Sequence, residues 1–320
     1  MAQIARRRII GAKIETTQNT PAAPAAGDFF WAYDVQVQPL GEQLERPYVS
    51  ASLDPYSNLI GKKWMNVKFK ADLKGSGTAG TAPPIGPILQ ACGMTETIVA
   101  VTSVTYAPSS VPASSSFFSP GKSCTLTIHE DGGAVNGPKY VVAGAVGNPK
   151  LTLEAGKIPY VEFDMLGIYT AVTDAAIPAN TPVAGDPPVM KSATLLLQTY
   201  AAIASKLEID FGNVISERTD LNSANSILGF QITGRKPTGS ADPEMVPVAT
   251  HDFWGKFMSG NLASSSIVAG ASAGNICTIT MPKTQYGQPS MADRNGISTL
   301  QVPLVFSRNS GDDWISIAFT

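Results

Sequence analysis

Apolar and polar residues alternate with a period of two in many separate segments of this chain. Successive side chains of a β-strand point to opposite faces, so the pattern predicts strands with one buried and one solvated face. Such half-buried strands are typical of antiparallel sheets. The clearest segments are residues 35–37, 67–73, 124–128, 161–165, 207–211, 300–306 and 315–319.

Two stretches have the spacing of a helix instead. In residues 84–92 the apolar side chains recur at every third or fourth position, and Gly93 follows as a C-terminal stop. In residues 250–259, Thr250 stands at the N-cap position and Gly260 ends the segment. Both segments are too short to be stable alone, so each is expected to pack on a sheet.

The composition excludes several classes of protein. The net charge is −2, whereas a nucleic-acid binder needs clustered Lys and Arg. No apolar run approaches the length of a membrane span, and the apolar stretch near the N-terminus is too short for a signal peptide. The three widely spaced cysteines, Cys92, Cys124 and Cys277, exclude a disulfide framework and favour a chain that folds in a reducing cytosol.

The chain repeats itself. The spacing of Gly147, Pro149 and Gly156 recurs at Gly287, Pro289 and Gly296, and an alternating strand follows each time. Other matches occur in the same order in both halves, which favours two copies of one β-rich unit, each with one short helix. The predicted parts are an N-terminal arm (1–27), a first domain (28–175), a proline-rich linker (176–188) and a second domain (189–320).

Three motifs have the appearance of chemical sites. Residues 75–80 fit a dinucleotide-binding glycine motif, but the strand before them alternates with lysines and no βαβ unit follows. Residues 270–274 fit a nucleophile elbow, but a strand rather than a helix follows and both histidines come earlier. Residues 129–131 (His-Glu-Asp) have too few partners for a metal site. We therefore expect no catalytic residue, cofactor or metal.

Several segments, in their order along the chain, resemble the major tail tube proteins of long-tailed bacteriophages. Nearly the whole chain takes part in the resemblance. The matching segments are residues 12–17, 75–83, 86–93, 102–106, 153–160 and 234–239. The Ser-rich residues 112–118 depart from the family pattern.

The resemblance implies a mainly β fold: two similar antiparallel β-sandwich or barrel-like tail-tube domains, each with one flanking helix. It implies a structural virion protein, made and assembled in the bacterial host cytoplasm, whose copies stack as rings around a channel for DNA. Two domains per chain would make each ring a homotrimer with pseudo-sixfold symmetry. The expected partners are other copies, the tape measure protein and the tail terminator and tip proteins, whereas DNA passes without specific binding.

We expect contacts between rings at the N-terminal arm and the glycine-rich loop, because neither has the pattern of a segment that packs on its own domain. Deleting residues 1–27 is then expected to leave a folded subunit that no longer forms long tubes. The contact residues expected on this basis are Arg6, Arg7, Arg8, Lys74, Gly75, Ser76, Gly77, Thr78, Ala79 and Gly80. The alternative function is a secreted or surface β-sandwich module that binds glycans or cells.

Overall fold

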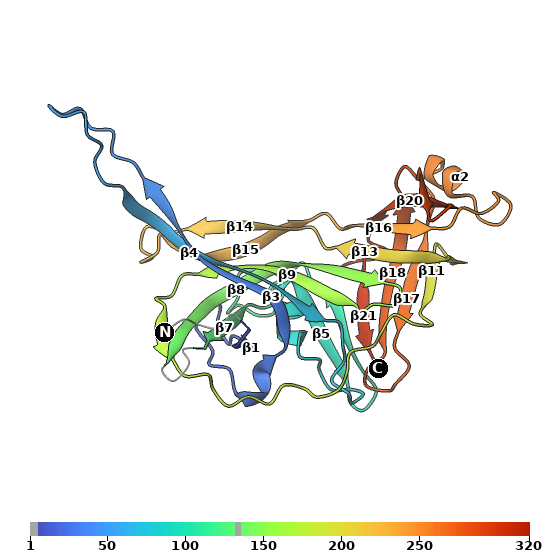
Figure 1. Ribbon diagram of the computed structural model, residues 1–320, viewed down its shortest axis with the longest axis horizontal. Coiled ribbons are helices and arrows are strands. Elements are labelled where there is room, and N and C mark those ends of the chain that lie inside the picture. The colour runs from blue at the N-terminus through green and yellow to red at the C-terminus, as the bar shows by residue number, and fades with distance from the viewer. Residues whose placement is uncertain (1–5, 132–135) are drawn as a thin grey trace.

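The computed structural model describes residues 6–131 and 136–320 as an elongated, mainly antiparallel β structure (Figure 1). A short 3₁₀ turn, η1 (Ala26–Asp28), precedes the second strand. The strands of the first half are β1 (Arg8–Ile14), β2 (Phe29–Phe30), β3 (Ala32–Leu44), β4 (Leu59–Asp72), β5 (Met94–Val99), β6 (Ser103–Pro108), β7 (Cys124–Glu130), β8 (Gly137–Glu154), β9 (Tyr160–Ile168) and β10 (Thr173–Ala175).

The second half contains the remaining strands, most of which lie at the right of Figure 1, while the hairpin of residues 213–235 extends to the left. They are β11 (Thr194–Leu197), β12 (Tyr200–Ala201), β13 (Ala204–Asp210), β14 (Asn213–Thr219), β15 (Ile227–Arg235), β16 (Thr238–Pro243), β17 (Leu262–Ala269), β18 (Cys277–Tyr286), β19 (Ser290–Arg294), β20 (Ile297–Phe306) and β21 (Ser316–Phe319).

In the first half the paired strands follow the order β3, β4, β9, β8, β7, β1. Strand β2 pairs with β1, and β10 pairs with the beginning of β8. The strands β5 and β6 form a separate hairpin after the first helix. All of these pairs are antiparallel, as the alternating sequence predicts.

In the second half the paired strands follow the order β13, β16, β20, β18, β17, β11. Strand β12 pairs with β11, and β21 pairs with the beginning of β18. Strands β14 and β15 continue the β13–β16 hairpin outward, and β19 pairs with the beginning of β20. These pairs are antiparallel as well.

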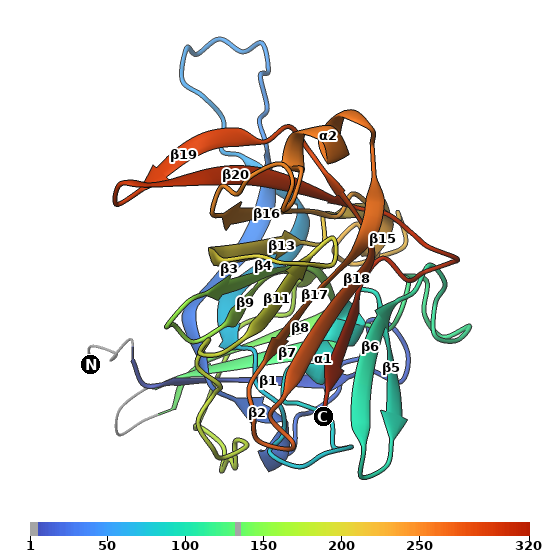
Figure 2. The same ribbon diagram turned by 90° about the vertical axis from the view of Figure 1, so that its right-hand side faces the viewer.

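The two halves are joined edge to edge. Strand β8 pairs on one side with β9 and on the other with β13, from Lys150–Asp210 to Glu154–Lys206. Strand β21 also pairs with β6, and Tyr106 and Phe319 pack with ring centroids 6.1 Å apart across that joint. Figure 2 shows strands of the two halves side by side at this joint. One cluster of buried apolar side chains runs through both halves, so they form a continuous core.

Both expected helices are present but shorter than expected. Helix α1 (Gly86–Ala91) has buried Ile88 and Leu89, and Gly93 adopts a positive φ of 79° after it. Helix α2 (Phe253–Met258) is capped by Asp252, whose side chain accepts a hydrogen bond of 2.7 Å from the Gly255 amide. The expectation that Thr250 caps this helix is therefore wrong, because the helix begins two residues later.

The N-terminal segment is not a free arm. From Arg8 onward it forms β1, which pairs with β7 over seven residues and buries Ile10 and Ala12. The expectation that this segment fails to pack on its own subunit is wrong for its described part, and residues 1–5 lie outside that part. Its removal would expose the edge of β7 and open the core, so deleting residues 1–27 would cost stability as well as assembly.

Glu15 fastens the segment after β1. Its side chain is only 2% exposed. One carboxylate oxygen accepts from the Asn19 amide (2.9 Å) and the Ser123 hydroxyl (2.6 Å), and the other from the Thr125 hydroxyl and the Gly144 amide, both at 2.8 Å. A buried carboxylate needs such donors to replace water. Glu15 therefore holds the N-terminal segment to β7 and β8.

Replacing Glu15 with Ala should destabilise the subunit strongly. The substitution leaves four donors without their acceptor, at a cost of about 3 kcal/mol or more in the free energy of unfolding. Urea unfolding of the unassembled subunit measures the loss, and the exposed Glu42→Gln serves as the control with no comparable change. A Glu15→Ala subunit as stable as the control would show that this network contributes little.

The three cysteines should behave as inert core thiols. All are free and buried, and burial raises the pKa of Cys277 to about 12. Little reactive thiolate exists at neutral pH when a thiol pKa is that high. Iodoacetamide should label the protein only after unfolding, and mass and unfolding midpoint should not depend on reductant. A native disulfide joining any two of them would contradict this.

Candidate assembly surfaces

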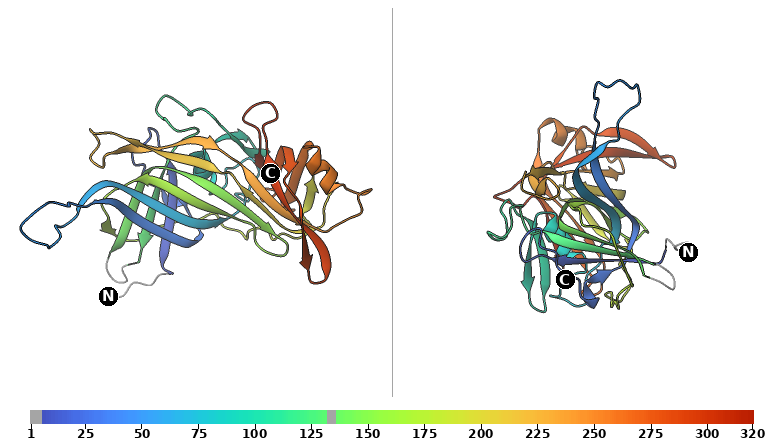
Figure 3. Two further views of the ribbon diagram at one scale, coloured as in Figure 1. Left: turned by 90° about the horizontal axis from the view of Figure 1, so that it is seen from above. Right: turned by 90° about the vertical axis from the view of Figure 1, so that its left-hand side faces the viewer.

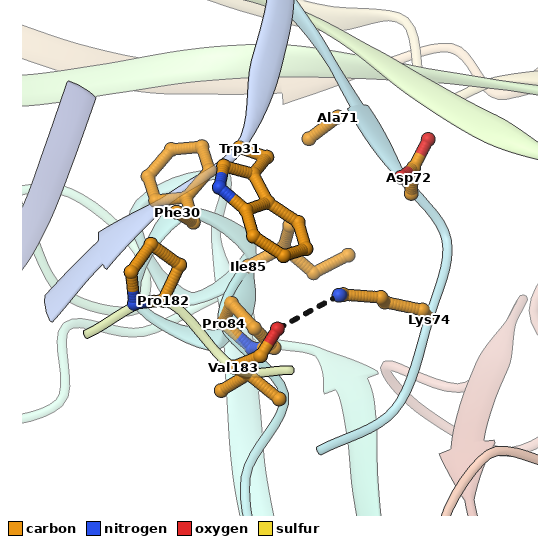
Figure 4. Close-up of a pocket in the computed structure, with 9 residues that line it drawn as sticks. All are labelled: Phe30, Trp31, Ala71, Asp72, Lys74, Pro84, Ile85, Pro182 and Val183. Carbon is orange, nitrogen blue, oxygen red and sulfur yellow. Dashed lines mark hydrogen bonds between the residues drawn. The ribbon is translucent and has the colours of Figure 1, made fainter. Parts of the chain in front are cut away.

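Lys74 lies inside the subunit rather than at its surface. Its side chain lies against the Trp31 ring, with Nζ 4.8 Å from the ring centroid, and donates to the carbonyls of Val183 (3.0 Å) and Gly185 (3.1 Å) (Figure 4). Burial lowers the pKa of Lys74. These bonds hold the proline-rich linker against the start of β3, so Lys74 fastens two parts of one chain together.

The glycine-rich loop after Lys74 packs against the second half. The Gly75 amide donates to the Asn275 side chain (2.8 Å), and the Gly77 amide donates to the Gly274 carbonyl (3.0 Å). A Cβ on Gly75 would lie 2.0 Å from that carbonyl oxygen, so only glycine fits there. The two motifs that resembled a dinucleotide loop and a nucleophile elbow therefore contact each other.

Little of this loop remains accessible. Gly77 and Thr78 are exposed, whereas Ser76, Ala79 and Gly80 are partly buried. The Ser76 hydroxyl donates to the carbonyls of Thr78 and Thr81 and so closes the loop on itself. The loop is thus held by bonds within its own chain, and only its tip faces outward.

The arginines at the start of β1 meet the acidic residues at the end of β7. Arg7 forms an ion pair of 3.0 Å with Asp131. Arg8 donates to the Val35 carbonyl (2.7 Å) and lies 3.5 Å from Glu130. Together with the exposed Arg6, they line one side of a hollow of about 740 Å³ beside the beginning of β3. The acidic residues of the motif at 129–131 thus serve as partners of arginines.

The two histidines are packed as core residues. Burial lowers the pKa of His251 to about 4, and this imidazole lies against Tyr200 and hydrogen-bonds to the Tyr286 hydroxyl at 3.0 Å. Burial also lowers the pKa of His129. Among the described residues, no three His, Cys, Asp or Glu side chains gather as a metal site would require. In the same residues, no helix is long and apolar enough to span a membrane.

Several strands pair on one side only in the described part of the chain, and β3 and β19 are two of them. Strand β3 pairs with β4 on one side, and β19 pairs with β20 on one side. Met291, in β19, is 77% exposed and Tyr33, in β3, is 38% exposed. Such edges readily accept a further strand. The sequence analysis did not identify them, because which edge remains open depends on pairings between distant segments.

The hairpin β3–β4 carries a second exposed surface. Its loop, residues 45–58, extends away from the rest of the molecule (Figure 1, blue; Figure 3). Val49 and Leu53 are fully exposed there, while Arg46 lies over the rings of Tyr48 and Tyr56 at 6.0 and 5.7 Å. A loop of 14 residues that presents apolar side chains to water is typical of a contact with another molecule. The apolar and aromatic content of residues 48–56 was the signal in the sequence.

The comparison with protein families agrees with the resemblance noted in the sequence. The model of the phage tail tube proteins matches residues 5–307, which is nearly the whole chain. No curated protein sequence matches the chain. The family is one of structural tail components, and the β-rich architecture with open strand edges suits that role. The chain belongs to the phage tail tube protein family.

Proposed function

We propose that this chain is the major tail tube subunit of a long-tailed phage and that it carries two tube domains, residues 28–175 completed by β1, and residues 189–320. The observation that carries this proposal is that one strand order occurs twice. The order β3, β4, β9, β8, β7, β1 corresponds to β13, β16, β20, β18, β17, β11, with β2 matching β12 and β10 matching β21.

The register of the pairs supports the same proposal. Val37 faces Val67 in the first half, and shifting both by the same number of positions gives Ile209 and Gly239, which face each other in the second. Irregularities recur as well. The pairing of β7 with β8 shifts between Cys124 and Leu126, and that of β17 with β18 shifts at the corresponding place. Bulges hold fixed positions within a family of folds.

A chain with two tube domains needs three copies to place six domains around a channel. The joint between β8 and β13 links the domains head to tail, and such heterologous contacts close into a ring when the rotation fits. We infer a homotrimeric ring with approximate sixfold symmetry. Stacked rings then form the tube between capsid and host, assembled in the host cytoplasm around the tape measure protein and bounded by terminator and tip proteins.

The polar face of the sheet suits the wall of a DNA channel. Its charges form ion pairs across neighbouring strands, with Lys68 at 2.8 Å from Asp164 and Lys150 at 3.5 Å from Glu208. Lysines that are already paired leave no cluster of free positive charge for phosphates. We propose that this face lines the channel and that DNA slides past it without specific binding.

Contacts between rings need surfaces other than the strand edges. Of the residues that we expected there, Gly77 and Thr78 are exposed, whereas Lys74 and Gly75 are committed to contacts within the chain. The projecting loop 45–58, with its exposed Val49 and Leu53, offers a larger apolar surface. We propose that this loop, together with Gly77 and Thr78, contacts the adjacent ring.

Purified protein at high concentration should form hollow tubes of uniform width with a regular axial repeat, visible by negative-stain electron microscopy. Val49→Asp combined with Leu53→Asp should fold with an unchanged unfolding midpoint but give single rings or short stacks, because apolar contact between rings is lost. Particles that remain monomeric under all conditions of concentration and salt would contradict the proposed function. Variant tubes as long as those of the wild type would exclude the loop from the contact.

A further inference from the structure

We propose that β19 of one copy pairs antiparallel with β3 of the next copy, so that one sheet continues from chain to chain around the ring. The inference rests on the proposed ring function and specifies its interface. The template is the joint inside the chain, where the end of β8 pairs with β13. The open edges of β19 and β3 belong to the strands that correspond to the two members of this joint.

The position of β19 follows from the strand it pairs with. Leu151 of β8 faces Val161 of β9, and Met291 of β19 faces Leu300 of β20. Strand β9 pairs with β4, the second strand of the β3–β4 hairpin, and β20 pairs in the same way with β16, the second strand of the β13–β16 hairpin. Strands β9 and β20 therefore correspond. Met291 therefore corresponds to Leu151, and Arg294 corresponds to Glu154.

The position of β3 follows in the same way. Both β3 and β13 are the first strand of a long hairpin, and Val37 and Ile209 are matching residues in the two registers. Each strand also has a register shift near its beginning, between Tyr33 and Gln36 in β3 and between Ala204 and Leu207 in β13. The match therefore includes the irregular part of the strand.

Combining the two correspondences fixes the register of the joint between chains. Within the chain, Ile209 faces Leu151 and Glu208 faces Thr152. The corresponding pairs between chains are Val37 with Met291 and Gln36 with Ala292. Asp34 then lies opposite Arg294, where the internal joint has Lys206 opposite Glu154. Opposite charges directly across a strand pair are favourable. Within the subunit Asp34 already pairs with Lys70, and Arg294 already pairs with Asp242 and Glu244, so the contact between chains would extend these ion pairs.

Exposure identifies a second copy as the missing partner. In the joint inside the chain, Leu151 and Ile209 are completely buried. Their counterparts are open: Met291 is 77% exposed, and Val37 is only partly buried. A strand that supplies a methionine to this place would cover Val37 in the way that β8 covers Ile209. The other end of the same chain carries that strand.

The hollow beside β3 leads to the same partner. A hollow of about 210 Å³ lies beside β13, and Leu153 and Ala155 from the end of β8 form part of its lining. The corresponding hollow beside β3 measures about 740 Å³, and no counterpart of these two residues lines it among the described residues. The counterpart of Leu153 is Asp293. Its carboxylate would enter beside the exposed Arg6 and near Arg7 and Arg8, which already pair with Asp131 and Glu130.

Cysteine cross-linking between copies tests the register. Single variants Gln36→Cys and Ala292→Cys are mixed, assembled and oxidised, so a covalent dimer forms only between different chains. The second pair is Val37→Cys mixed with Met291→Cys. Hydrogen-bonded and non-hydrogen-bonded pairs alternate along an antiparallel ladder, so the two adjacent pairs include one of each type. At least one of these pairs should give about tenfold more covalent dimer than Gln36→Cys mixed with Ser290→Cys, because a disulfide demands directly opposed residues.

The native cysteines are buried, so each single variant alone gives the background. Dimer from an in-register pair in samples that contain tubes supports the joint. Tubes without dimer from either pair, or with equal dimer from the Ser290 mixture, overturn the joint and leave the proposed function standing. Failure of the wild-type protein to form tubes in the same electron micrographs overturns the proposed function and the joint with it.

Discussion

The need of every strand edge for hydrogen-bond partners governs this structure. The backbone of β8 is satisfied on both sides at its end, by β9 and by β13, and this double pairing makes one sheet from two halves of the chain. The same need is unmet at β3 and β19 within the described residues. A fold that ends in two compatible edges is suited to grow by addition of identical copies, which is what a tube requires.

The alternating pattern predicted the local structure well. The segments around Val67, Val161 and Leu207 are strands, and both short helices lie where the spacing of apolar residues placed them. The first strand was missed because Gly11 and Lys13 interrupt its short apolar run, so it reads as a polar tail. Its place is set by β7 and by the buried Glu15, and neither contact leaves a local signal.

The assembly surfaces were harder to predict for the same reason. Lys74 and the glycines after it had the composition of a mobile loop, yet their environment comes from the linker and from the turn at Gly274, distant in sequence. The arginines were expected to grip an acidic surface, and in the subunit Arg7 and Arg8 lie beside Asp131 and Glu130. Which edges stay open depends on all pairings at once, so local sequence patterns could not identify β3 and β19.

The central claim is that one chain supplies two equivalent units to a ring of six. A cryo-electron microscopy map of the assembled tube tests it most directly, because chain number and strand order can both be traced. The account predicts three chains per ring, with residues 28–175 together with β1 superposing on residues 189–320 as one strand framework around the channel. Six chains per ring, or two halves whose strands do not superpose, would contradict it.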